Sequence, residues 1–172
     1  MRKLFAFPNP VNEVSARLVA GGVVLLTLTI LLAGQTWAIA VLAYGFVARV
    51  LTGPTLSPLG QFVTRVVTPA LPVEAKLVAG PPKRFAQGVG ATLSVSAAIL
   101  HFGFGATTAA LVLVAMITVA ATLESVFAFC LGCVMFAGLM RVGVVPEAVC
   151  QDCNDIWSRI DRHADREPVP TA

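Results

Sequence analysis

The sequence predicts an all-α membrane protein, a polytopic bundle of four transmembrane helices accompanied by interfacial amphipathic helices. Of the 172 residues, 57% are hydrophobic and only 12% are charged, whereas soluble domains contain about 25% charged residues. A water-soluble fold of this length would expose large apolar patches, which lipid can cover instead. No Lys or Arg lies between Arg17 and Arg49 or between Arg84 and Arg141, and the apolar segments fall in these two intervals.

An N-terminal arm, residues 1–17, comes before the first apolar segment. Asn12 followed by Glu13 predicts a helix start, because an Asn oxygen accepts hydrogen bonds from free backbone N–H groups and an acid favours the first turn. A cleaved signal peptide is the alternative for this region, since Arg2 and Lys3 resemble its basic beginning. The arm is long and contains prolines, which argues against cleavage.

The membrane domain is expected to extend over residues 18–140 and to begin with a helical hairpin. Its first two apolar segments, residues 18–33 and 36–51, are separated by a minimal connection. In lipid each segment must satisfy its own backbone hydrogen bonds, which favours two antiparallel helices. Trp37 stands at the start of the second segment, and aromatic side chains there are typical of the membrane interface.

A proline-rich connection, residues 52–83, follows this hairpin and contains one amphipathic stretch. Apolar residues recur there at helical spacing and form one face: Leu59, Phe62, Val63, Val66 and Val67. Such a face predicts a helix. The helix either lies in the plane of the membrane interface or packs across the ends of the spans, and both interpretations fit the pattern.

The third and fourth apolar segments differ in length. Residues 84–105 are rich in Gly, Ser and Ala, which let helices approach closely in lipid. Residues 106–140 would form a helix about 50 Å long, against a hydrocarbon core of about 30 Å. Either the chain turns near Glu124 and creates a fifth span, or one helix projects past the membrane. No Pro or Gly marks a turn there, so we expect a single long or bent helix.

The C-terminal tail, residues 141–172, is expected to form a cytoplasmic amphipathic helix. Its apolar stripe has helical spacing and consists of Val149, Cys153, Ile156, Trp157 and Ile160. With four spans, the tail, the arm and the long connection share one side of the membrane, and so do all 12 basic residues. The positive-inside rule then places both termini in the cytoplasm and the protein in the cytoplasmic membrane. The basic residues form no patch or stripe of the kind that binds nucleic acid.

Two Cys-x-x-Cys pairs are the strongest candidates for chemistry. Cys130 and Cys133 fall in the fourth apolar segment, and Cys150 and Cys153 open the predicted tail helix. Residues three apart lie on one helical face, so each pair can approach disulfide geometry. Free N–H groups at a helix start favour a thiolate. Cys150 is therefore expected to be the attacking thiol, with Cys133 as the other candidate.

Three interpretations of these cysteines stay open. They could be redox dithiols or sulfur carriers that serve a partner protein. The spacing C-x2-C-x16-C-x2-C also matches a four-cysteine zinc site, which would make the protein a scaffold without catalysis. They could also be small buried thiols that only pack. The dithiol interpretation, which needs no cofactor, is preferred because the apolar side chains around the first pair offer no donors to a negatively charged zinc site.

Glu124 is an acidic residue inside an apolar segment. Intramembrane carboxylates often mark functional sites, so a small transporter is a further hypothesis. In a continuous helix Glu124 would face about 120° away from Cys130 and about 180° away from Cys133, too far round to act as a base for either thiol. We expect Glu124 to mark the cytoplasmic border and to pair with Arg49 or Arg84.

Several short motifs occur in order along the chain. They are Asn12 and Arg17, Gly53-Pro54 through Pro58, Pro82-Lys83-Arg84-Phe85-Ala86, Glu124, and Cys130-Leu131-Gly132-Cys133. In these motifs the chain resembles the bacterial membrane proteins grouped as domain-of-unknown-function family 4395, over residues 8–153. The resemblance implies a helical inner-membrane protein of no established activity, whose relatives are encoded near thioredoxin-like and sulfurtransferase proteins, which supports thiol or sulfur chemistry. Together with the cysteines, it leads us to expect a dithiol redox or sulfur-relay partner, or membrane anchor, of a cytoplasmic thioredoxin-like or rhodanese-like protein.

Overall fold

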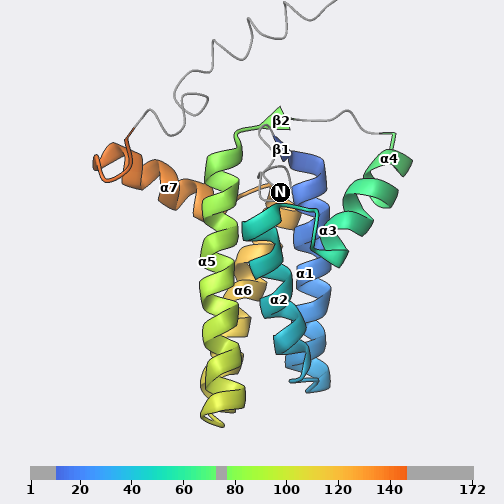
Figure 1. Ribbon diagram of the computed structural model, residues 1–172, viewed down its shortest axis with the longest axis vertical. Coiled ribbons are helices and arrows are strands. Elements are labelled where there is room, and N and C mark those ends of the chain that lie inside the picture. The colour runs from blue at the N-terminus through green and yellow to red at the C-terminus, as the bar shows by residue number, and fades with distance from the viewer. Residues whose placement is uncertain (1–10, 73–76, 147–172) are drawn as a thin grey trace, which may run out of the picture.

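Four helices stand side by side and form the body of the molecule (Figure 1). They are α1 (Glu13–Ala33), α2 (Ala38–Thr52), α5 (Gly80–Ala98) and α6 (Thr107–Phe127). The remaining elements are β1 (Val11–Asn12), α3 (Pro58–Phe62), the π-helical turn η1 (Val63–Val67), α4 (Thr68–Ala70), β2 (Leu77–Val78), the π-helical turn η2 (Ile99–Gly103) and α7 (Leu131–Arg141). The computed structural model describes residues 11–72 and 77–146. The predicted all-α bundle is confirmed.

Within the described residues, three helices are long and apolar enough to cross a membrane. They are α1, α6 and the continuous unit of α5 with η2, Gly80–Gly103. α2 is also apolar but has only 15 residues. Many large apolar side chains point away from the bundle and remain exposed, among them Leu25, Leu32, Val112, Val119 and Val126. A bilayer would cover this surface, and the chain is a membrane protein.

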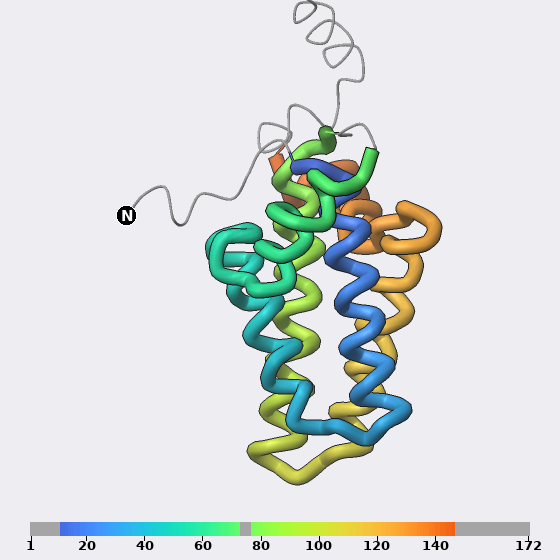
Figure 2. Tube along the Cα trace, turned by 90° about the vertical axis from the view of Figure 1, so that its right-hand side faces the viewer, coloured from blue at the N-terminus to red at the C-terminus, as the bar shows by residue number. Residues whose placement is uncertain are grey.

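The two ends of the bundle differ in charge. At one end, called here the distal end, loops 34–37 and 104–106 join the helices in pairs (Figure 2), and neither loop contains a charged residue. At the other end, the charged end, α1 and α5 begin and α2 and α6 finish. The Lys and Arg residues of the described segments all lie toward this end: Arg17, Arg49, Arg65, Lys83, Arg84 and Arg141.

The core of the bundle lies where α1 packs on α6 and α2 packs on α5. Buried aliphatic side chains fill it: Val23, Ile30, Ile39, Leu42, Val114 and Ile117. α2 and α5 approach closely at Gly90, where a Cβ atom would come within 2.2 Å of Cε1 of Phe46. The prediction that small residues let the third segment pack closely is confirmed at this position.

α1 begins at the residue that the sequence predicts. Asn12 is its N-cap, and Asn12 Oδ1 accepts a hydrogen bond of 3.0 Å from the backbone N–H of Val14. Just before this cap, β1 pairs antiparallel with β2, with Val11 opposite Val78. The short ladder ties the beginning of α1 to the beginning of α5.

The long connection contains the predicted helix, which runs through α3, η1 and α4. Leu59 packs on α1, where a Cβ atom at Gly22 would meet Leu59 Cδ1 at 2.7 Å, and Val63 is buried. Phe62 and Val66 are more than half exposed. The predicted apolar face is therefore divided, with one edge against the bundle and the other edge facing outward.

The fourth apolar segment is not one long helix, so that expectation is wrong. α6 ends at Phe127, Ala128 adopts the left-handed conformation with φ 56°, and α7 begins at Leu131. The chain turns here, as the five-span alternative required, but α7 alone is too short for a span. With 11 residues, α7 is about 16 Å long, roughly half of the hydrocarbon thickness, and it runs sideways from the end of the bundle (Figure 1).

Arg17 explains how the chain turns here without Pro or Gly. Its guanidinium donates hydrogen bonds of 3.0 and 3.2 Å to the backbone carbonyl of Ser125 and of 3.2 Å to that of Val126. The last carbonyls of a helix have no partner within the helix, so these bonds stabilise the end of α6. The predicted tail helix, with Cys150 and Cys153, lies outside the described residues.

Candidate functional site

The first cysteine pair lies at the beginning of α7. Cys130 is the N-cap residue, with extended backbone angles (φ −89°, ψ 101°). The Cys130 carbonyl accepts hydrogen bonds from the backbone N–H groups of Cys133 (3.0 Å) and Val134 (3.1 Å). The expectation that this pair sits inside a continuous helix is therefore wrong, because α6 has already ended. Cys130 therefore lies at a helix start, which the sequence predicts for Cys150. Cys150 itself lies outside the described residues.

The two sulfur atoms lie close together but differ in environment. Both are free thiols, Cys130 is buried and Cys133 is partly exposed. The hydrogen bond from the Cys133 thiol, followed by the positive charge of Lys83, lowers the pKa of Cys130 in spite of its burial. The same hydrogen bond and burial raise the pKa of Cys133. Cys130 is thus the sulfur that forms a thiolate more readily.

Gly132, inside the Cys-x-x-Cys motif, fixes the position of the pair against α5. A Cβ atom at Gly132 would lie 2.5 Å from both Cα and Cβ of Ala86. Such a distance leaves room only for glycine, so α7 and α5 touch backbone to backbone here. A second contact farther along α7 joins Phe136 and Phe85, whose ring centroids are 5.7 Å apart.

An ion pair lies close to the thiols. Lys83 Nζ is 2.7 Å from Glu124 Oε1, and the two side chains are 9% and 15% exposed. The expectation that Glu124 pairs with an arginine, Arg49 or Arg84, is wrong in the identity of the partner. Arg84 follows Lys83 on α5 but points outward and donates to the carbonyl of Val50 at 3.2 Å.

Arg49 is a buried cation that the sequence did not single out as a site residue. It is 6% exposed, its Nε donates to Gln87 Oε1 at 3.0 Å, and its guanidinium lies 4.5 Å from the centroid of the Phe46 ring. Among the described residues, the structure gives its guanidinium this one hydrogen bond. The signal in the sequence was the position of an arginine near the end of an apolar segment.

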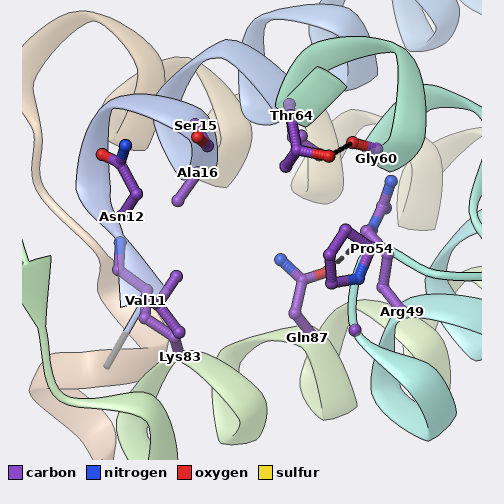
Figure 3. A pocket seen from close by; sticks show the side chains of 12 residues that line it. Val11, Asn12, Ser15, Ala16, Arg49, Pro54, Gly60, Thr64, Lys83 and Gln87 are labelled. Carbon is purple, nitrogen blue, oxygen red and sulfur yellow. Dashed lines mark hydrogen bonds between the residues drawn. The ribbon is translucent and has the colours of Figure 1, made fainter. Parts of the chain in front are cut away.

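Arg49 and Gln87 stand between two cavities. The outer cavity, about 210 Å³, lies among the beginnings of α1 and α5, the end of α2 and α3 (Figure 3). Polar side chains around it include Asn12, Ser15 and Thr64. The other cavity, called here the thiol cavity, has about 290 Å³ and is lined by residues of α1, α2, α5, α6 and α7.

Cys130 and Glu124 both line the thiol cavity, and Arg49 and Gln87 line it as well. The expectation that Glu124 faces away from the thiols assumed a continuous helix, and the turn at Ala128 removes that assumption. Both residues lie at the charged end of an otherwise apolar lining. The site therefore combines a thiol pair, a buried cation and a carboxylate.

The zinc-site hypothesis stays a prediction. Within residues 11–72 and 77–146, no three His, Cys, Asp or Glu side chains come together as a metal site. Two of the four proposed ligands, Cys150 and Cys153, lie outside these ranges.

A family model described as a domain of unknown function, DUF4395, matches residues 11–141. The chain belongs to this family. The DUF4395 region contains the whole four-helix bundle and the Cys130–Cys133 pair, and it ends before Cys150. No curated protein and no solved structure matches the chain.

Proposed function

We propose that this DUF4395 protein carries out thiol–disulfide exchange, with Cys130 and Cys133 cycling between two thiols and one disulfide. The observation that carries the proposal is the N-cap position of Cys130, with the Cys133 thiol hydrogen-bonded to it from the first turn of α7. A helix N-terminus and a neighbouring donor both stabilise a thiolate. Burial alone would raise the pKa of Cys130 and disfavour its thiolate. A role limited to packing therefore does not explain why the thiolate is stabilised here.

The difference in exposure assigns the two sulfurs different roles. Cys133, the more exposed thiol, meets a protein partner, and Cys130 remains inside. In the oxidised protein, a partner thiolate attacks Cys133 Sγ, the Cys130–Cys133 bond breaks, and Cys130 leaves as a thiolate. The partner's second thiol loses its proton and attacks the partner sulfur of the mixed disulfide, which releases Cys133. The partner thereby becomes a disulfide, and two electrons reach the Cys130–Cys133 pair.

The lowered pKa of Cys130 suits this direction of transfer. A thiol of lower pKa is the better leaving group in thiol–disulfide exchange, and the hydrogen bond from the Cys133 thiol is the main cause of the lowered pKa of Cys130. The partner is proposed to be a thioredoxin-like protein, because such proteins present a dithiol. The charged end, with its Lys and Arg residues, is proposed to face the cytoplasm under the positive-inside rule, so the partner meets the site there.

The test is to trap the partner in intact cells. In a Cys130→Ser variant, Cys133 attacks an oxidised partner, and the mixed disulfide accumulates because Cys130 is not there to resolve it and attack by the partner's own second thiol only returns the starting molecules. In a Cys133→Ser variant much less accumulates, because Cys130 is buried. Non-reducing gels followed by mass spectrometry of the adduct provide the measurement.

Two controls make the trapping experiment decisive. Adding Cys150→Ser and Cys153→Ser to the trapping variant is expected to leave the adduct unchanged. In the reduced protein, alkylation of Cys130 by a small maleimide is expected to begin at lower pH than for an ordinary cysteine, and Cys133→Ala moves this profile to higher pH. Absence of any adduct, with an unchanged redox state of thioredoxin-like proteins in both Ser variants, would contradict the proposed function.

A further inference from the structure

The thiol cavity has features that thiol–disulfide exchange with a soluble protein does not require. It extends from Cys130 into the apolar part of the bundle, where Val23, Phe46 and Ile117 line it. Its outer lining includes Met116, Leu131 and Met135, which are about half exposed. These residues lie on α6 and α7, on the surface that lipid covers. The cavity therefore opens on the side of the bundle, between α6 and α7.

The inner end of this cavity offers hydrogen bonds to a neutral ligand. The Arg49 side chain is buried, with 6% exposure. Among the described residues its guanidinium makes one hydrogen bond, through Nε. Its terminal N–H groups, which the described residues leave without an acceptor, are not sealed away from the cavity and can donate to a ligand there. Glu124 also lines the cavity but is already paired with Lys83, so Arg49 is the cation that balances a Cys130 thiolate at this site. A neutral molecule with carbonyl oxygens fits this lining better than an anionic phosphate.

We infer that the thiol cavity binds the ring headgroup of a lipid-soluble quinone, and that this quinone is the oxidant of the Cys130–Cys133 dithiol. The inference rests on the proposed function and names the second substrate of the same site. A volume of about 290 Å³ is at the lower end of the roughly 300–1,000 Å³ of small-molecule sites, which suits one ring. The hydrophobic tail of the quinone leaves sideways between Met116 and Met135. Arg49 donates hydrogen bonds to a ring oxygen.

The chemistry balances as a two-electron transfer. The Cys130 thiolate adds to a ring carbon, a carbon–sulfur bond forms, and the displaced electron pair goes to a ring oxygen, which takes up the proton that Cys130 had lost. Cys133 then attacks Cys130 Sγ and loses its own proton. The disulfide bond forms, the carbon–sulfur bond breaks with its electron pair returning to the ring, and the second oxygen takes the proton. Two thiols and a quinone become a disulfide and a quinol.

The buried guanidinium contributes to the first of these steps. Negative charge develops on the ring oxygen as Cys130 adds to the ring, and a fixed cation in a water-poor site stabilises such charge strongly. The neighbouring contact of Arg49 with the Phe46 ring and its bond to Gln87 hold the guanidinium in place. Arg49 is therefore assigned to quinone binding and charge stabilisation.

The experiment uses the full-length protein in detergent micelles. The protein carries Cys150→Ser and Cys153→Ser, so that every thiol measured belongs to Cys130 or Cys133. The reduced protein is mixed without oxygen with a decyl-substituted ubiquinone, whose ring carbons are all substituted and therefore resist permanent arylation. Quinol formation and thiol loss are followed together. A parallel reaction uses a small hydrophilic disulfide as oxidant, which reaches Cys133 from water. Equimolar quinol and lost dithiol are expected.

Cavity variants distinguish binding in the thiol cavity from reaction at the surface. Ala120 lines the cavity, and Ala120→Phe is expected to slow the quinone reaction at least roughly tenfold by filling it. Arg49→Gln is expected to slow the quinone reaction by a similar factor, whereas Ala120→Phe keeps the rate with the hydrophilic disulfide. Val119→Phe, on the exposed face of the same helix, is the matched control and leaves both rates unchanged.

The outcomes separate the two proposals. If the hydrophilic disulfide oxidises the pair and the quinone does not, the inference fails and the proposed function stands. Equal quinone rates in the Ala120→Phe variant and the parent protein would also overturn it, because the reaction then occurs outside the cavity. If neither oxidant forms the Cys130–Cys133 disulfide, both proposals fail.

Discussion

The two ends of the bundle are closed in different ways. At the distal end, α1 finishes at Gly34 and the α5–α6 connection contains Gly105, each with a φ of 66°. At the charged end, α2 also finishes at a glycine with positive φ, Gly53 (63°), but the residue after α6 is Ala128, which is left-handed without being glycine. Arg17, 108 residues from Ser125 in the sequence, supports this end of α6. The distal end is closed by the conformational freedom of the local backbone. The charged end is held by contacts between distant side chains, so its geometry can carry a functional site but is less visible in the sequence.

The largest effect is expected from breaking the ion pair at the charged end. Glu124→Leu leaves Lys83 buried without its partner, which is expected to cost about 3–5 kcal/mol of unfolding free energy. The double variant Lys83→Met/Glu124→Leu is expected to recover most of this loss, because no unpaired charge remains. Thermal unfolding in detergent micelles measures both.

A substitution at the distal end serves as the control for the stability loss at the charged end. Trp37→Phe removes the hydrogen bond from Trp37 Nε1 to Gln35 Oε1, 2.9 Å long and exposed, which is expected to cost about 0.5 kcal/mol. A loss for Glu124→Leu no larger than the loss for Trp37→Phe would remove the energetic distinction between the two ends.

A smaller effect is expected where the thiol pair rests on α5. Gly132→Ala places a Cβ atom 2.5 Å from the Cα of Ala86, so α7 must shift, at a cost of about 1–3 kcal/mol. The shift also moves Cys130, and the rate of thiol–disulfide exchange falls. Gly138→Ala is the matched control on the same helix, since nothing lies within 4 Å of its new Cβ. An unchanged exchange rate in Gly132→Ala would show that the contact with α5 does not position the thiols.

Effects of about 1 kcal/mol and of opposite sign are expected at two of the left-handed residues, Gly34 and Ala128. Gly34→Ala introduces the left-handed strain of an L-residue and is expected to lose about 1 kcal/mol. Ala128→Gly relieves the same strain and is expected to gain up to about 1 kcal/mol, reduced by the greater freedom of glycine in the unfolded chain. Unfolding midpoints in one detergent compare the pair, and a loss in both variants would mean that Ala128 is not strained.

The sequence predicts features that depend on neighbouring residues. The Asn12 cap and the position of Trp37 follow from local rules, and the structure places both as expected. The close approach at Gly90 was indicated by the small residues of its segment. The cap and the tryptophan act within one turn of their own helix, and the small residues that permit the contact with Phe46 of α2 are visible within their own segment.

The candidate site was harder to predict, because its geometry depends on how helices are rotated and docked. Lys83 and Arg84 are adjacent in the sequence, and the rotation of α5 decides that Lys83 reaches Glu124 while Arg84 points outward. The end of α6 depends on Arg17, on another helix. Nothing in the residues next to Ala128 predicts its left-handed conformation. The sequence pattern therefore favoured a continuous helix, which would have placed Cys130 and Glu124 on different faces.

The ion pair has a consequence for how the chain assembles in the membrane. Lys83 lies in the first turn of α5 and Glu124 in the last turn of α6, so each charge faces the like-signed end of its own helix dipole. Either helix alone would fray at that terminus. In the docked hairpin, the attraction between Lys83 and Glu124 offsets both unfavourable interactions with the helix dipoles. Since α5 and α6 follow one another in the chain, the ion pair makes the docked α5–α6 hairpin more stable than either helix alone.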